Sequence, residues 1–338
     1  MKRLWSSLLA LSLAISLSAC SQSNNSQSEK ANETLTIYSG RTAEYMGSLF
    51  EDFTAETGIK LEIRYGDSAA LAAQLLEEGG NTPADLFISQ DAGALGAVSS
   101  SELLTPLTGE VLDRVTSEYR SPINDWVALT GRVRILAYAP DRVTNLPKTV
   151  DELTGPAWSG RLGIAPTNAS FQTFITAMIQ TRGEAATEKW LRGIVANKPK
   201  FFEKNSLIVE SIDAGEIDAG LVNHYYVWEV SEELGRAINV KNSFFAPGDI
   251  GNLVNVSGIG VLRSSQKSKL AESLIQYLLR DSSQKFFVEN VHEYSIVNPE
   301  LKPEDLPALT EVKAPKVQLA QLSDLQRTQK LLIKVGLL

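Results

Sequence analysis

The chain has 338 residues, with 32 lysines and arginines against 40 aspartates and glutamates, and a formal net charge of −8. This length allows one large or two ordinary domains with a buried core. The acidic balance argues against a protein that wraps nucleic acid with a basic face. One cysteine and two histidines exclude an internal disulfide framework and a metal site built mainly from thiolate or imidazole. Any ligand chemistry must therefore use oxygen atoms, backbone groups or aromatic rings.

The N-terminus has the features of an export signal. Lys2 and Arg3 precede an apolar stretch at 8–17 that is too short to span a membrane as a helix. The run LSAC, which ends at Cys20, resembles a bacterial lipobox, in which the cysteine is lipidated and becomes the first residue after cleavage. We therefore expect residues 1–19 to be a signal peptide.

Residues 21–33 are polar and of low complexity, which is typical of a flexible tether. Removal of residues 1–19 takes away two basic residues and no acidic one, so the net charge becomes −10. The expected product is an exported protein on the periplasmic or extracellular face, held at the membrane by a lipid on Cys20.

The body opens with a regular alternation of strands and helices. A β-rich run at 35–40 is followed by a helical period that Gly58 ends, and an alternating strand follows at 59–65. An alanine- and leucine-rich helix at 68–78 then leads to a buried strand at 84–89. This βαβαβ pattern predicts a parallel sheet, in which ligands bind beyond the carboxyl ends of the strands.

The second half continues the α/β pattern. Extended runs at 125–130 and 133–138 surround Gly131 and suit strands that cross between two lobes. Further elements are expected at 162–165 (strand), from Phe171 (helix), at 217–222 (strand), from Val227 (helix), at 254–262 (strands), at 267–279 (helix) and near 321–335 (helix).

The fold class that follows is α/β with two lobes of the periplasmic-binding-protein type (type 2) and a ligand cleft between them. We expect lobe 1 to comprise 34–131 and 257–306, and lobe 2 to comprise 132–256 and 307–338.

Two adjacent tyrosines are the most pointed feature. Tyr225 and Tyr226 lie at a predicted strand-to-helix junction, where both side chains can point into a cleft. A helix N-terminus favours negative charge and lowers the cost of ionising a phenol. Phenolate is a hard oxygen donor that suits a hard cation such as Fe³⁺. The residues alone leave sugar stacking or core packing as alternatives.

From about residue 34 to its end, the chain resembles the ferric-ion-binding substrate-binding proteins of bacterial iron ABC transporters. The stretches that carry the resemblance are LTIYSG (35–40), TGIK (57–60), ADLFIS (84–89), DWVALTGR (125–132), GEAATEKWL (183–191), KNS (204–206), GEIDA (215–219) and NHYY (223–226).

The resemblance implies that Tyr225 and Tyr226 are phenolate ligands of Fe³⁺. Members with four protein ligands also have a histidine where this chain has Thr42 and a glutamate where it has Gln90, so half of that set is missing. Thr42 and Gln90 are left as weak contributors, together with Asp91. Tyrosine-dominated members have a third tyrosine in the loop that reads Asn168–Ser170 here. Tyr45 lies on a predicted helix and is expected to be packed.

The resemblance also implies a phosphate- or carbonate-like synergistic anion. Its expected seat comprises Asn168, Ala169, Ser170, Asn205 and Asn223, which are neutral donors at helix starts and strand ends. The alternative is that these residues only cap helices, with Asn168 or Ser170 as a natural N-cap.

The two histidines are not expected to bind metal. His224 precedes the tyrosine pair, and neighbouring side chains seldom point the same way, while His292 is placed away from the cleft loops. The sequence shows no nucleophile elbow, HExxH or phosphate loop.

The predicted function is the extracytoplasmic solute-binding component of an ABC importer, a monomer that delivers Fe³⁺ to a permease and its ATPase. It is not expected to be an enzyme or to bind nucleic acid. Two alternatives remain, namely the same role with a phosphonate, polyamine or thiamine as cargo, and an extracytoplasmic enzyme on a similar scaffold.

Overall fold

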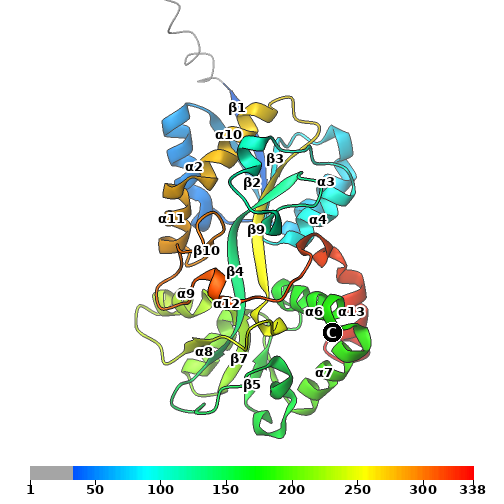
Figure 1. Ribbon diagram of the computed structural model, residues 1–338, viewed down its shortest axis with the longest axis vertical. Helices are drawn as coiled ribbons and strands as arrows, with labels where there is room; N and C mark the ends of the chain where they lie inside the picture. Colours follow the sequence, from blue (N-terminus) through cyan, green and yellow to red (C-terminus); the bar gives the residue numbers. More distant parts are fainter. Residues whose placement is uncertain (1–32) are drawn as a thin grey trace, which may run out of the picture.

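Three parallel strands and their helices open the part of the chain that the computed structural model describes, residues 33–338 (Figure 1). β1 pairs in parallel with both β2 and β3, which confirms the predicted βαβαβ unit. α2 buries Phe50 and Phe53, and Gly58 ends it in the left-handed conformation (φ 75°) that glycine adopts without strain. The elements are β1 (Thr34–Ser39), α2 (Ala43–Thr57), β2 (Lys60–Tyr65), α3 (Ser68–Glu78), η1 (Gly79–Asn81), β3 (Leu86–Ser89) and α4 (Ala92–Ser100).

Two long antiparallel strands join the lobes. β4 (Trp126–Tyr138) pairs with β9 (Val254–Val261) along most of its length, with a register shift between Ala128 and Thr130. The sequence predicted two runs around Gly131, but β4 is continuous there, because Gly131 pairs with both Val256 and Tyr294. In Figure 1 these two strands run vertically between the upper and lower groups of helices.

The second lobe is built on the far half of β4. β7 pairs antiparallel to β4 and parallel to β5, so hydrogen bonds connect the strands in the order β2-β1-β3-β9-β4-β7-β5-β6. The lobe contains η3 (Val150–Thr154), η4 (Pro156–Trp158), β5 (Leu162–Ile164), α6 (Ala169–Arg182), α7 (Glu184–Ala196), β6 (Lys200–Phe201), α8 (Asn205–Asp213), β7 (Ala219–Asn223), α9 (Tyr226–Glu233), β8 (Lys241–Ser243) and η5 (Ile250–Asn252).

The remaining elements complete the first lobe and the C-terminal segment. They are α5 (Gly109–Leu112), η2 (Ser117–Tyr119), α10 (Ser268–Leu279), α11 (Asp281–Asn290), β10 (Tyr294–Ser295), α12 (Leu309–Val312), η6 (Leu319–Ser323) and α13 (Leu325–Lys334).

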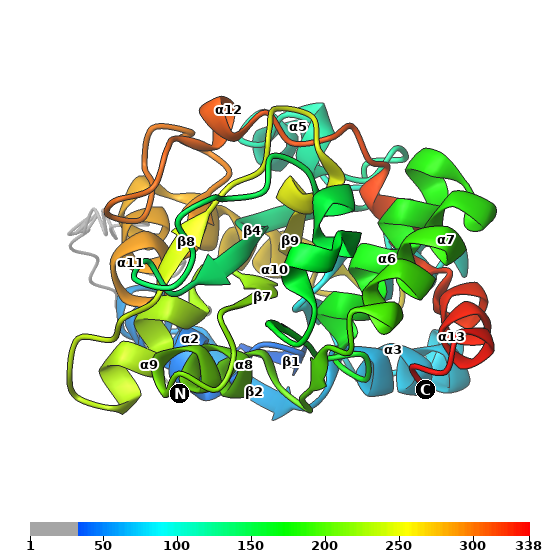
Figure 2. The same ribbon diagram turned by 90° about the horizontal axis from the view of Figure 1, so that it is seen from below.

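The C-terminal segment contacts both lobes. Seen from below, α13 lies beside α6 of the second lobe (Figure 2), whereas η6 packs on α4 of the first lobe. The approach to α4 is close, because a Cβ on Gly96 would lie 2.3 Å from the carbonyl oxygen of Ala320. The assignment of 307–338 to lobe 2 stays a prediction, and the small residues of α4 let η6 pack closely against the first lobe as well.

The predictions for residues 1–32, including the signal peptide and the lipid site at Cys20, lie outside the described residues, and so does nearly all of the tether. Among residues 33–338, no helix has the length and apolar character needed to cross a bilayer.

The close contact between α4 and η6 predicts opposite effects for one change at two helical glycines. Gly96→Ala should lower the free energy of unfolding by about 1–3 kcal/mol, because the new methyl group meets the Ala320 carbonyl. Gly47→Ala in α2, where a Cβ meets nothing within 4 Å, should raise it by about 0.5–1 kcal/mol. Chemical denaturation measures both, and equal effects would contradict the contact.

Candidate functional site

A small cavity of about 110 Å³ lies between the lobes, at the carboxyl ends of strands from both. The first lobe contributes the residues after β3, and the second contributes the start of α6 and the turn between β7 and α9. Its lining comprises Gln90, Asp91, Arg132, Asn168, Ala169, Ser170, Thr173, Asn223, Tyr225 and Tyr226. The structure thus brings together residues that lie far apart in the sequence, including eight of the predicted site residues.

The two tyrosines both face this cavity. β7 ends at Asn223 and α9 begins at Tyr226, so the intervening turn frees both rings from strand alternation. Their ring centroids are 4.5 Å apart and the planes are inclined by 33°. The two hydroxyl groups can therefore reach the same small ligand.

The ionisation of Tyr225 differs from the sequence-based expectation. Its side chain is buried, and this burial, followed by the neighbouring Tyr226, raises the pKa of the Tyr225 phenol well above its usual value. Desolvation therefore outweighs any effect of the α9 N-terminus. The phenol is therefore protonated at neutral pH.

The predicted anion seat is a hydrogen-bonded group at the start of α6. Asn168 is the N-cap of this helix, as one of the two sequence options proposed, and its Oδ1 accepts from the Ser170 backbone N–H (3.0 Å). Asn205 lies behind the loop, where its Nδ2 donates to Ser170 Oγ at 3.0 Å. Its Oδ1 is buried and has no partner among the described residues. Asn205 supports the loop and does not line the cavity.

The weak contributors fall in different places. Gln90 and Asp91 line the cavity, although Asp91 Oδ1 also accepts from the Ala94 N–H as the N-cap of α4. Thr42 is the exposed N-cap of α2 and is not among the lining residues. Tyr45 is half-buried, and its hydroxyl group donates to Glu229 Oε2 of α9 at 3.2 Å. Tyr45 therefore forms a contact between the lobes.

His224 is buried inside the protein. Its Nδ1 accepts from the Val133 backbone N–H (3.1 Å), which leaves Nε2 to donate to the His292 carbonyl oxygen (2.7 Å). Burial lowers the pKa of His224 to about 4, so the ring is neutral at pH 7.

His292 does not lie away from the cleft elements, as the sequence suggested. Its ring stacks on Trp228 of α9 at 5.4 Å between centroids, and its Nε2 lies 2.9 Å from Glu232 of the same helix. The loop after α11 reaches α9 only in the folded chain, so linear sequence separation was misleading.

Sequence reasoning missed a buried ionic group beside the cavity. Arg41 Nη1 lies 2.8 and 2.9 Å from the two carboxylate oxygens of Glu293, and Thr130 Oγ1 donates to Glu293 Oε2 at 2.5 Å. Burial raises the pKa of Glu293, but the charges of Arg41 and Arg132 outweigh this effect and lower it overall. A buried acid so far along the chain gives no local sequence signal.

Arg132 and Arg134 of β4 were missed as well. Their side chains are only 3% and 2% exposed. Arg134 Nη2 donates to the Leu221 carbonyl (2.8 Å), and its guanidinium lies over the rings of Phe171 and Phe174. Arg132 lines the cavity. The i, i+2 spacing of two arginines in a strand is the signal that could have found them.

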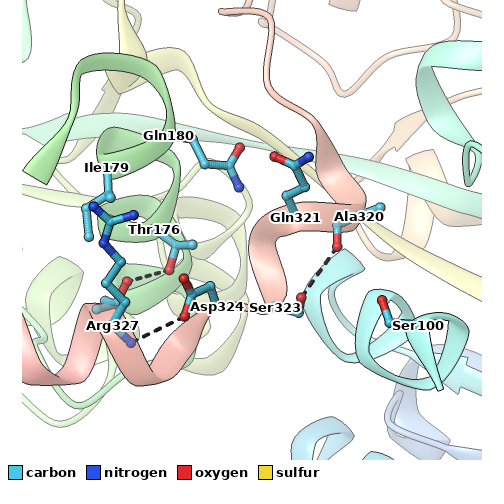
Figure 3. Close-up of a pocket in the computed structure, with 10 residues that line it drawn as sticks. Ser100, Thr176, Ile179, Gln180, Ala320, Gln321, Ser323, Asp324 and Arg327 are labelled. Carbon is cyan, nitrogen blue, oxygen red and sulfur yellow. Dashed lines mark hydrogen bonds between the residues drawn. The ribbon is translucent and has the colours of Figure 1, made fainter.

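Two further observations concern metal-binding clusters and a second cavity. Among residues 33–338, no group of three or more histidine, cysteine, aspartate or glutamate side chains is placed to hold a metal ion. A larger cavity of about 380 Å³ lies between α4, α6 and the C-terminal segment (Figure 3), but it contains none of the predicted site residues.

Comparison with known proteins places the chain among binding proteins. The family described as bacterial extracellular solute-binding protein matches residues 81–317. The Fe(3+)-binding periplasmic protein of Serratia marcescens is 31% identical over 98% of this chain and 96% of that protein. Iron-bound HitA from Pseudomonas aeruginosa is 32% identical and superposes with a TM-score of 0.83 over 90% of this chain and 99% of that one. Trichodesmium FutA with iron and citrate is 26% identical, with a TM-score of 0.78 over 90% and 100% of the two chains.

The ionic group at Glu293 predicts a large loss of stability on neutralisation. Glu293→Gln leaves Arg41 with an unpaired buried charge, and should lower the free energy of unfolding by about 3–5 kcal/mol. Glu56→Gln removes the acid of an exposed pair with Arg280 and should cost less than about 1 kcal/mol. Similar denaturation midpoints for the two variants would show that the buried pair is not needed.

Proposed function

Because the chain belongs to the family of bacterial extracellular solute-binding proteins, we propose that it binds Fe³⁺ between its lobes through Tyr225 and Tyr226, completes the metal's shell with a synergistic anion, and delivers the iron to an ABC permease. The relatives support the role of an exported, periplasmic Fe³⁺-binding component of an ABC importer. Members of the family bind and deliver substrates and are not enzymes.

The observation that carries the proposal is the tyrosine pair in a cavity with few other hard donors. Both rings line the 110 Å³ space, and Asp91 is its only carboxylate among the described residues. Phenolate oxygen suits a highly charged, hard cation. Because burial raises the pKa of the Tyr225 phenol and keeps it protonated at neutral pH, iron binding must release this proton and weaken as the pH falls.

An anion held by Asn168, Ala169, Ser170 and Asn223, with Asn205 behind them, supplies the remaining donors. Two phenolates leave most of an octahedral shell open, and Thr42 is not positioned to fill it. Gln90 and Asp91 face the tyrosines from the first lobe, so a ligand or water held there joins the two lobes. Contact with both lobes stabilises the closed state, which is what a permease can recognise.

The alternative cargoes fit this cavity less well. A polyamine needs several carboxylates, whereas the lining offers one acid and a buried arginine. Thiamine exceeds a space of about 110 Å³, which is room for roughly four water molecules. A phosphonate shares the chemistry of the anion seat, and it becomes the cargo if the protein binds such anions but no iron.

The iron proposal predicts a coloured protein that depends on both phenols. Protein loaded with ferric citrate should be red from phenolate-to-iron charge transfer, and Tyr225→Phe or Tyr226→Phe should lower iron affinity roughly 100-fold or more, because each removes a direct ligand. Visible absorbance and metal content measure this. Tyr65→Phe, at an exposed tyrosine in β2, is the matched control.

A folded wild-type protein that stays colourless and iron-free with ferric citrate at neutral pH would refute the proposal. Colour that survives in the double phenylalanine variant would place the metal elsewhere.

We further infer that the mature protein is tethered by a lipid on Cys20, on the strength of the LSAC motif and the polar stretch at 21–33. The wild-type protein should partition into the detergent phase of a cell extract. Cys20→Ala should abolish lipid attachment and its mass increment in mass spectrometry, whereas Ser21→Ala should not. A mature wild-type chain without lipid would contradict the inference.

A further inference from the structure

The sheet of the first lobe ends in a strand whose outer edge is free among residues 33–338. β2 is the outermost strand and pairs only with β1, and Figure 2 shows it at the margin of the molecule. The backbone N–H of Lys60 donates to the Glu33 carbonyl on the β1 side (2.9 Å). Backbone groups alternate in direction along a strand, so those of Leu61, Ile63 and Tyr65 point outward. Outward N–H and C=O groups of this kind can pair with another strand.

The side chains of β2 alternate between an apolar face and a charged face. Leu61 and Tyr65 line an open groove of about 470 Å³ beside α2, and Tyr65 is 41% exposed. Lys60, Glu62 and Arg64 are exposed and lie on the opposite face of the strand. In the part of the chain that the structure describes, neither Glu62 nor Arg64 forms an ion pair. The free edge therefore presents opposite charges beside an apolar stripe.

Hydrogen bonding and charge together select one way for a second copy to pair with this edge. In an antiparallel two-fold pair, outward-facing residues must lie opposite outward-facing residues. β2 has six residues, and two such registers pair five of them, with the axis at Glu62 or at Ile63. An axis at Glu62 places the two glutamates opposite each other and Lys60 opposite Arg64, so like charges meet. An axis at Ile63 instead places Glu62 opposite Arg64 of the other copy, twice.

The register with its axis at Ile63 also suits the positions of the side chains. Its two charged pairs fall at the non-hydrogen-bonded positions, where opposing side chains are closest. On the other face, Leu61 lies opposite Tyr65 of the second copy. The two apolar stripes then form one continuous surface between the two α2 grooves.

We propose that β2 is a self-association surface and that its partner is a second copy of this chain, paired antiparallel about a two-fold axis at Ile63. The sheets of the two first lobes then become one sheet. The dimer differs from the monomer that the sequence suggested. It uses no residue of the cavity between the lobes, so it does not depend on the proposed function.

Charge reversal tests the register. The experiment uses purified protein with Cys20→Ala, so that no lipid contributes to association, and sedimentation equilibrium measures the dimer. Glu62→Arg and Arg64→Glu should each raise the dissociation constant about tenfold or more, because each replaces two attractive pairs with two repulsive ones. The double variant should recover the affinity of the parent protein. An equimolar mixture of the two single variants should form a mixed dimer.

Residue-resolved hydrogen exchange tests the backbone pairing. The outward amides of Leu61, Ile63 and Tyr65 should exchange more slowly as the protein concentration rises, because the second copy bonds them. The Lys60 amide, which is bonded on the β1 side, should show no such dependence. Outward amides that are protected equally at all concentrations would assign the edge to another segment of the same chain and overturn the proposal.

Asp113→Arg is the matched control, since it reverses an exposed acid at the end of α5, and it should associate like the parent protein. Thermal unfolding of each variant shows whether the fold survives. The proposal fails if the parent stays monomeric up to about 1 mM, which corresponds to a binding free energy weaker than about 4 kcal/mol. It also fails if the folded single reversals associate normally, or if the double variant does not recover. Loss of the dimer with retained iron binding, or the reverse, separates this proposal from the iron function.

Discussion

The antiparallel pairing of β4 with β9 is the constraint on which the rest of the structure depends. Each strand passes through both lobes, so a single backbone fixes three side chains at successive depths. Thr130 lies in the ionic group, Arg132 lines the cavity and Arg134 lies beneath α6. Strand alternation places all three on one face. The register shift beside Thr130 is where this ladder is least regular, and is the natural place for it to bend.

The buried ionic group around Glu293 lies beside this register shift and restricts how the two crossing strands can move there. Glu293 comes from the loop after α11, Arg41 from the loop after β1, and Thr130 and Ser257 from the two crossing strands. An apolar hinge would tolerate many small displacements, whereas a buried carboxylate is stable only while its donors surround it. Tyr45 and His292 add contacts from the first lobe to α9. These contacts connect the first lobe directly to the helix that begins at Tyr226.

Local sequence patterns were enough for the fold, and for much of the site's lining. Hydrophobic periodicity predicted the βαβαβ unit, and strand ends followed by polar or aromatic residues pointed to Asn168 and Tyr225. Glu293 was missed because its partners Thr130 and Arg41 lie 163 and 252 residues away. Arg132 was missed because only the folded chain brings it to the cavity beside residues of other elements. Thr42, an exposed N-cap, does not line the cavity in this structure, which spacing along the chain alone could not indicate. The ionisation of Tyr225 was misjudged because burial, which opposes the helix N-terminus, is a tertiary property.

The lining of the cavity contains no histidine and a single carboxylate, Asp91. A cation therefore meets few of the usual protein ligands there. Arg132, which lines the cavity, and Arg134, two residues further along β4, are both buried and give the cavity a positive character, which opposes the arrival of a bare metal ion. An oxyanion removes that opposition, and it also supplies donors that the chain lacks. Under the proposed function, capture requires the metal, the anion and loss of the Tyr225 proton together. In the proposed function, selectivity for a highly charged, oxygen-seeking ion thus arises from the lack of histidine and of further carboxylates in the cavity lining as much as from the two tyrosines.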